Sequence, residues 1–217
     1  MIKFCDLHSH STFSDGTDTP AELVKKAQVL GLSALALTDH NSADGLPEFM
    51  EAGDTYDVLT VPGCEFSTEW EGRELHVVGL GFAEETWPEI KDYVELFHIS
   101  KINSNRQLIS RLQAAGYPVT YEEAQALTDG DIFNRAHVAR ILVQKGSISS
   151  IKEGFSTILK EGNGFYEPAK RLSSLATIRF IKLYGGKAVL AHPFLNLTEE
   201  ELRLFLPAAK AAGLDAI

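Results

Sequence analysis

Residues 6–16 read DLHSHSTFSDG and follow an apolar run that begins at Ile2. Residues 2–8 predict a first strand, which places His8 and His10 at its carboxyl end. Two positions apart at a strand end, these imidazoles project to the same side and could bind one cation, because imidazole is a good ligand for Zn, Fe or Mn. Taken alone, a His-x-His pair is more often a chance surface pair, so a metal site requires support from other residues of the chain.

Short apolar runs and amphipathic segments largely alternate along the chain, which predicts an α/β fold with parallel strands. The expected strands and hairpin are 2–8, 34–38, 58–61, 65–70 with 73–80, and 187–191. The expected helices are 19–30, 46–52, 173–184 and 198–213. Residues 214–217 look like the beginning of another strand.

The middle of the chain, 86–165, reads as almost entirely helical. Thr86 with Glu89 predicts the cap of a long amphipathic helix, and Thr120 with Glu123 predicts a second capping box. Asn134 could cap a further helix. We interpret 86–165 as a helical insertion, a cap or lid on a body made of 1–85 and 166–217.

Composition narrows the classes of partner. With 217 residues, 44% hydrophobic and 23% charged, the chain is typical of a soluble globular protein rather than a disordered one. Lys and Arg number 20 against 30 Asp and Glu, a net charge of −10, which does not support an extended basic surface for duplex DNA or an anionic membrane. Any phosphate recognition is therefore expected to be local.

The compartment is expected to be the cytoplasm. Cys5 and Cys64 are far apart in the sequence and each lies in a strand-like apolar run, which suits buried, reduced thiols better than a disulfide. No run approaches the roughly 18 apolar residues of a membrane helix, and the N-terminal residues lack the apolar core of a signal peptide.

Further histidines and acids fall at or beside the predicted strand ends, where functional groups of a parallel barrel converge. They are Asp15, Asp39, His40, Glu65, His76 and His192. Each alone has an ordinary explanation: a turn carboxylate, a helix cap, a solvated acid or a satisfied strand histidine. Their joint recurrence favours a metal site, and a carboxylate such as Glu65 can bridge two cations, as in multinuclear hydrolytic sites.

These residues resemble the polymerase and histidinol phosphatase (PHP) family over essentially the whole chain. Five ordered motifs support the resemblance: DLHSHSTFSDG at 6–16, TDHN at 38–41, PGCE at 62–65, ELH at 74–76 and AHP at 191–193. The resemblance implies a distorted (β/α)7 barrel that holds two or three divalent ions, Zn, Mn or Fe, at the carboxyl ends of its strands. Cellular supply as well as affinity selects among such metals, so the sequence leaves the ion open.

The resemblance also implies a ligand set. The first metal takes His8, His10 and Glu65, the second takes Glu65, His76 and His192, and the third takes Asp15 and His40. The family normally continues to a late Asp-x-His pair, whereas this sequence stops at Ile217. We therefore expect the C-terminal end of the barrel to be missing, and the strand edge left there could support self-association.

The insertion resembles that of the stand-alone phosphoesterases of the TrpH and YciV group. This implies a nucleoside 3′,5′-bisphosphate, or the 5′ end of a short oligonucleotide, as substrate, hydrolysed by a metal-activated hydroxide. Arg135 offers a planar fork for phosphate oxygens, and His137 could bind a second oxygen or protonate the leaving group. The ordinary alternative is a solvated cation at a helix start and a half-buried helix histidine.

Other interpretations remain open at this point. Hydrolysis of histidinol phosphate is the other free-standing activity of the family, and a non-catalytic PHP fragment that needs a partner is a third possibility. Lys170 and Arg171 are weaker phosphate candidates that we expect on a solvated face. His98 is expected to have only a packing role.

Overall fold

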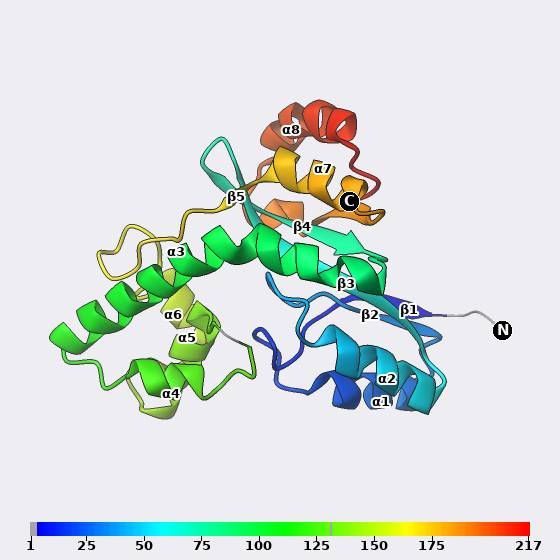
Figure 1. Cartoon of the computed structure of the whole chain (residues 1–217). Helices are drawn as coiled ribbons and strands as arrows, with labels where there is room; N and C mark the ends of the chain where they lie inside the picture. Colours follow the sequence, from blue (N-terminus) through cyan, green and yellow to red (C-terminus); the bar gives the residue numbers. More distant parts are fainter. Residues whose placement is uncertain (1–3, 131) are drawn as a thin grey trace. The chain divides into compact units, whose positions relative to one another are not determined.

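The computed structural model describes residues 4–130 and 132–217 (Figure 1). These residues divide into two compact units, which we call the body and the helical unit. The body comprises residues up to Ser11 together with 16–94 and 171–217, and the helical unit comprises 12–15 and 95–170. The helical insertion at 86–165 inferred from the sequence stays a proposal.

A six-stranded sheet forms the centre of the body, and the mixed α/β class expected from the sequence is confirmed. Its strands are β1 (Cys5–Ser9), β2 (Ala34–Leu37), β3 (Leu59–Trp70), β4 (Arg73–Leu80), β5 (Leu172–Ser173) and β6 (Lys187–Ala191). They run in the order β1-β2-β3-β4-β6, with β5 paired to β3. β1, β2 and β3 are parallel, whereas β4 is antiparallel to both neighbours, so the sheet is mixed and curls as a partial barrel.

β3 is a single strand of 12 residues where the sequence predicted two separate segments. Its first part pairs with β2 and its second part, from Gly63, pairs with β4. A Cβ at Gly63 would lie 2.7 Å from the Gly79 carbonyl oxygen and 3.0 Å from Thr38 Cγ2, so glycine here permits close strand packing. The predicted hairpin turn is confirmed, since Glu71 and Gly72 both have positive φ.

Four longer helices belong to the body, namely α1 (Pro20–Val29), α2 (Leu46–Tyr56), α7 (Ser174–Leu183) and α8 (Glu199–Ala212). Capping boxes at Thr19 and Thr198 begin α1 and α8, which confirms the predicted starts of these two helices. α2 continues past the predicted Ala52 to Tyr56, and its C-cap residue Asp57 takes a left-handed conformation. Side chains such as Phe49, Phe66 and Phe205 are fully buried between these helices and the sheet.

The helical unit contains most of α3 (Trp87–Ala114), together with α4 (Tyr121–Gln125), α5 (Arg135–Gln144) and α6 (Ile151–Ser156). The capping box at Thr120 is confirmed. The cap predicted at Thr86 is wrong, because Thr86 ends a 3-10 turn, Glu84–Thr86, and its hydroxyl donates to the Ala83 carbonyl at 2.7 Å. Leu108, Leu142 and their neighbours form a separate core in this unit.

The chain ends and cysteines differ in part from expectation. β1 begins at Cys5, and Ile2 and Lys3 of the predicted strand lie outside the described residues. Of the strand predicted at 214–217, Ala216 forms one bridge, with Val189 of β6. Cys64 is buried as expected, but Cys5 is exposed. Across the described residues, no helix combines the length and apolar character required to span a bilayer.

Candidate metal centre

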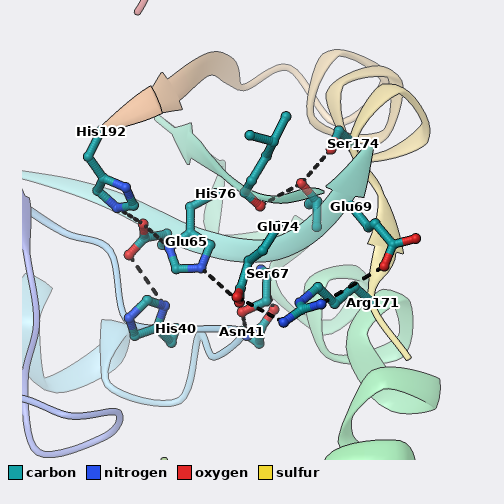
Figure 2. Close-up of polar contacts among 12 residues, drawn as sticks. His40, Asn41, Glu65, Ser67, Glu69, Glu74, His76, Arg171, Ser174 and His192 are labelled. Carbon is teal, nitrogen blue, oxygen red and sulfur yellow. Dashed lines mark hydrogen bonds and ion pairs between the residues drawn. The ribbon is translucent and has the colours of Figure 1, made fainter. Parts of the chain in front are cut away.

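Glu65 lies near the middle of β3 with its side chain 1% exposed, and five histidine nitrogens surround its carboxylate. Figure 2 shows His40, His76 and His192 beside Glu65. Oε2 faces three of them, His8 Nε2 at 3.0 Å, His10 Nε2 at 3.1 Å and His40 Nδ1 at 3.3 Å. Oε1 faces the other two, His76 Nδ1 and His192 Nε2, both at 2.9 Å. The body therefore brings together six of the seven metal ligands expected from the sequence.

The five imidazoles form a closed ring around the carboxylate. Successive ring centroids lie 5.1 Å (His8 to His10), 4.6 Å (His10 to His40), 5.1 Å (His40 to His76), 5.0 Å (His76 to His192) and 5.7 Å (His192 to His8) apart. Strands β1, β2, β3, β4 and β6 all end at or run through this ring. Residues up to 184 positions apart in the sequence thus converge on one carboxylate.

A single carboxylate cannot satisfy this many imidazoles. An ionised carboxylate offers about four lone-pair sites, two on each oxygen, whereas three ring nitrogens face Oε2 alone. Ligand atoms bound about 2.1 Å from one cation are separated from each other by about 3 Å in octahedral and about 3.4 Å in tetrahedral geometry, close to the distances around Glu65. Imidazole and carboxylate are also the donor types that Zn, Mn and Fe accept. The residues present therefore fit divalent ions.

The two Glu65 oxygens divide the histidines into two sets. Oε2 lies with His8 and His10, and Oε1 lies with His76 and His192, which are the sets expected for the first and second metals. His40 adds a further grouping, because the ligand atoms of His40, Glu65 and His76 lie within 4.8 Å of one another. The role of each residue as a ligand remains a proposal.

Asp39 positions the segment that presents His10, a role that sequence reasoning missed. Its carboxylate is 2% exposed and accepts from the Ser11 backbone N–H at 2.7 Å and the Ser11 hydroxyl at 2.6 Å. Gly16, at the end of the loop that follows Ser11, donates its backbone N–H to the Ser11 carbonyl at 2.9 Å. A Cβ on Gly16 would lie 2.2 Å from the His10 carbonyl oxygen, so the loop requires glycine.

Local hydrogen bonds and backbone conformation position the segments that carry His40 and His192. Asn41 has φ of 50°, and its side-chain amide donates to Ser67 Oγ and accepts from the Ser67 N–H, both at 2.9 Å. This pair clamps the segment after His40 to β3. His192 follows β6 with φ of 30°, a left-handed conformation that few residues other than glycine adopt and that is unusual before proline. That turn directs the imidazole toward Glu65.

The protonation states of Glu65 and of the histidines around it depend on one another. Burial alone would raise the pKa of Glu65, but hydrogen bonds from the surrounding histidines, His10 first, hold it well below its usual range. Burial alone would lower the pKa of His76, but hydrogen bonds to Glu65 and Glu74 raise it to about 9. A metal binds the neutral imidazole, so a metal ion held by His76 near neutral pH would require the release of the ring proton.

Three predicted site residues belong to the helical unit. The Asp15 carbonyl accepts from the Arg140 guanidinium at 2.5 Å, and the place of the Asp15 carboxylate on a third metal stays a prediction. Arg135 lies over the Tyr166 ring, 4.0 Å from its centroid, and donates to the Leu159 carbonyl at 3.0 Å. Arg135 is therefore held by an aromatic ring and a carbonyl rather than fully solvated.

His137 is fully buried rather than half-buried. Its Nδ1 accepts from the Asn134 backbone N–H at 3.0 Å, which places the ring proton on Nε2. Burial, with the charges of Arg140 and Lys101, lowers its pKa to about 4. At neutral pH the ring is uncharged and can donate a hydrogen bond through Nε2–H.

The structure also describes the surroundings of the weaker phosphate candidates, Arg171 and Lys170, and of His98. The Arg171 side chain is 6% exposed and contacts Glu74, so the expectation of a solvated face is wrong for this residue. Lys170 is exposed, and its backbone N–H donates to Ser100 Oγ at 2.7 Å. His98 lies beside Phe97, with ring centroids 6.2 Å apart.

Comparison with known proteins identifies the family. Residues 6–169, three quarters of the chain, match the PHP domain. The chain belongs to the PHP domain family. This PHP domain is 36% identical to a 5′-3′ exoribonuclease of Haemophilus influenzae over 218 residues, which cover 100% of the chain and 79% of the relative.

Two further proteins are similar to this PHP domain. A 3′,5′-nucleoside bisphosphate phosphatase of Chromobacterium violaceum is 32% identical over 189 residues, which cover 87% of the chain and 66% of the relative. A solved structure from Bifidobacterium adolescentis, described as a metal-dependent phosphoesterase, has a TM-score of 0.88 at 27% identity and covers 100% of this chain and 77% of that one. The exoribonuclease and the bisphosphate phosphatase both cleave phosphate esters, so the PHP domain belongs with hydrolases.

Proposed function

We propose that this PHP domain is a metal-dependent phosphoesterase that acts on a nucleotide or short oligonucleotide. The observation that supports the proposal most is the buried Glu65 carboxylate with two histidine sets on its two oxygens. A carboxylate shared in this way suits two cations about 3.5 to 4 Å apart, the spacing of two-metal phosphoesterases. The names of the relatives favour phosphate esters of nucleotides.

The chain's own residues would prepare the reaction. His8, His10, His40, His76, His192 and Glu65 would hold the ions, and Asp15 is proposed as a further ligand. When bound, divalent ions supply Lewis-acid polarisation of phosphate oxygens and lower the pKa of water. Asp39 and Asn41 hold the ligand-bearing segments in place through hydrogen bonds to Ser11 and Ser67. This arrangement limits reorganisation during catalysis.

Arg135 and His137 are proposed to contact a substrate phosphate. The Tyr166 ring and the Leu159 carbonyl hold the Arg135 guanidinium in one orientation, which lowers the entropy lost when it contacts an anion. His137 would contribute its Nε2–H as a neutral donor, because a pKa of about 4 leaves little imidazolium at neutral pH. A general-acid role for His137 would need that pKa to rise when substrate binds.

The finer proposal is a nucleoside 3′,5′-bisphosphate, or the 5′ end of a short oligonucleotide, as substrate. Phosphate release should be measured with adenosine 3′,5′-bisphosphate, a 5′-phosphorylated short RNA and histidinol phosphate, each with Mn²⁺, Zn²⁺ or Fe²⁺. We expect turnover of a nucleotide substrate, loss of turnover on chelation, and no turnover by Glu65→Gln. Preference for histidinol phosphate would favour the other family activity, and metal binding without turnover of any substrate would contradict the proposal.

A further inference from the structure

His76 lies between two carboxylates, and its two ring nitrogens face different ones (Figure 2). Nδ1 lies 2.9 Å from Glu65 Oε1, inside the metal centre, and Nε2 lies 3.5 Å from Glu74 Oε1. Glu74 and His76 are two positions apart on β4 and therefore share one face of the strand. One nitrogen is thus available for a cation only if the other nitrogen holds the ring proton.

Arg171 holds the Glu74 carboxylate from the opposite side. Its Nη2 donates to Glu74 Oε2 at 2.8 Å, and its side chain is 6% exposed. The next residue begins β5, whose register on β3 pairs Leu172 with Thr68. The sheet therefore determines where this guanidinium lies, and a buried guanidinium requires a close carboxylate.

The neighbouring acid, Glu69, differs from Glu74 in its surroundings. Glu69 stands opposite Glu74 across the β3 and β4 pair, but it is 46% exposed and its Oε2 is 3.9 Å from Arg171 Nη1. The Glu74 side chain is 26% exposed, with one oxygen toward Arg171 and the other toward His76. A simple surface ion pair would not divide its oxygens between a cation and a metal-centre histidine.

We propose that Glu74 is a positioning residue that accepts the Nε2–H of His76 and so keeps Nδ1 free of a proton for a metal ion. This rests on the metal centre of the proposed function. Carboxylates that accept from the second nitrogen of a metal-bound histidine fix its tautomer and orientation and make the ring a better ligand. Arg171 fixes which Glu74 oxygen faces His76. Arg171 therefore positions Glu74, and Glu74 positions His76.

Glu74→Gln tests this order of contacts. Arg171 offers only N–H donors, so the single oxygen of the new amide would turn toward Arg171 and its NH₂ group toward His76. That NH₂ can donate only to an unprotonated Nε2, which places the ring proton on Nδ1. The variant therefore selects the tautomer that blocks the metal-facing nitrogen while it preserves side-chain size.

The experiment measures metal binding by the full chain, independent of catalysis. Zn²⁺ and Mn²⁺ affinities are determined by competition with a chelator, for wild type, Glu74→Gln and the control Glu69→Gln. We expect one ion to bind 10 to 100 fold more weakly in Glu74→Gln, the range found for carboxylates behind metal-bound histidines, and within twofold of wild type in Glu69→Gln. Equal affinities in all three proteins would overturn the proposal.

Spectroscopy and a double variant separate positioning from a loss of structure. In the Zn²⁺-loaded wild type, long-range ¹H–¹⁵N spectra should show His76 with a protonated Nε2 and a metal-bound Nδ1. Adding Arg171→Ala to Glu74→Gln frees the amide to present its oxygen to His76, and should restore at least half of the lost affinity on a logarithmic scale. A metal-bound Nε2, or no restoration in a double variant whose metal-free melting temperature matches that of Glu74→Gln, would overturn the inference.

Failure of this inference and failure of the proposed function give different results. Metal binding that depends on His76 without phosphoester hydrolysis would contradict the function alone. Hydrolysis and metal binding unaffected by Glu74→Gln would contradict the positioning role alone. Absence of His76-dependent metal binding in the wild type would overturn both.

Discussion

Acidification should destabilise the helical unit through His137, the buried histidine near the start of α5. The ordinary pKa of histidine is 6.5, and burial with the nearby charges of Arg140 and Lys101 lowers the pKa of His137 to about 4. Above pH 6.5 the ring is neutral in the folded and unfolded chain, so it has no effect on the pH dependence of stability. Below pH 6.5 the unfolded chain binds a proton that the folded chain does not, and stability falls until about pH 4.

The size of this effect follows from the difference between the two pKa values. At about 1.36 kcal/mol per pKa unit, the difference between 6.5 and 4 corresponds to about 3 kcal/mol of unfolding free energy lost by pH 4. Such a loss is a large fraction of the stability of an ordinary domain. His137→Gln should remove this pH dependence, because glutamine does not titrate and its oxygen can still accept from the Asn134 N–H.

Two measurements check the prediction. NMR titration of the His137 ring should give a pKa near 4, and urea unfolding from pH 7 to 4.5 should show a steeper fall for wild type than for His137→Gln. Differences between the two proteins isolate His137 from the other groups that titrate in this range. A His137 pKa near 6.5, or parallel pH dependence of the two proteins, would refute the reasoning and restore the imidazolium as a candidate general acid.

Three substitutions test the proposed site. Glu65→Gln should abolish phosphatase activity and lower bound metal more than His98→Ala does, as measured by elemental analysis and phosphate release, and equal values would remove the bridging role. Arg135→Ala should lower kcat/KM by roughly 10 to 1000 fold at unchanged metal content, whereas values within twofold of wild type would make Arg135 a structural cation. Gly16→Ala should weaken metal binding, measured by competition with a chelator, at least several fold, because its Cβ would lie 2.2 Å from the His10 carbonyl oxygen. Unchanged affinity would show that the loop adapts.

Local signals allowed much of the fold to be predicted from the sequence. The capping box of Thr120 with Glu123 involves residues three positions apart, and its hydrogen bonds form as expected. β6 has the predicted bounds, Lys187–Ala191, because its apolar run ends at a histidine before proline. Polar residues at strand ends likewise predicted that His8, His10 and His40 would meet, since the parallel strands β1 and β2 bring their carboxyl ends to one edge. Glu65 and His76 instead lie within β3 and the antiparallel β4.

Contacts between distant segments could not be predicted in the same way. The sequence predicted two segments, 58–61 and 65–70, yet β3 runs through Pro62 and Gly63 because the strand changes partners there, from β2 to β4. Asp39 read as a helix cap, but its carboxylate binds Ser11, 28 positions away. Arg171 read as a solvated cation, and its carboxylate partner is 97 positions away. In each case the decisive contact depends on sheet register, which no local pattern specifies.

Anomalous X-ray diffraction from crystals of the chain grown with Mn²⁺ or Zn²⁺ tests the central claim most directly. The account predicts one ion about 2.0 to 2.3 Å from Glu65 Oε2 that is shared with His8 and His10, and a second at the same distance from Oε1 that is shared with His76 and His192. Anomalous peaks only elsewhere, with the Glu65 carboxylate still hydrogen-bonded to the histidines, would contradict it.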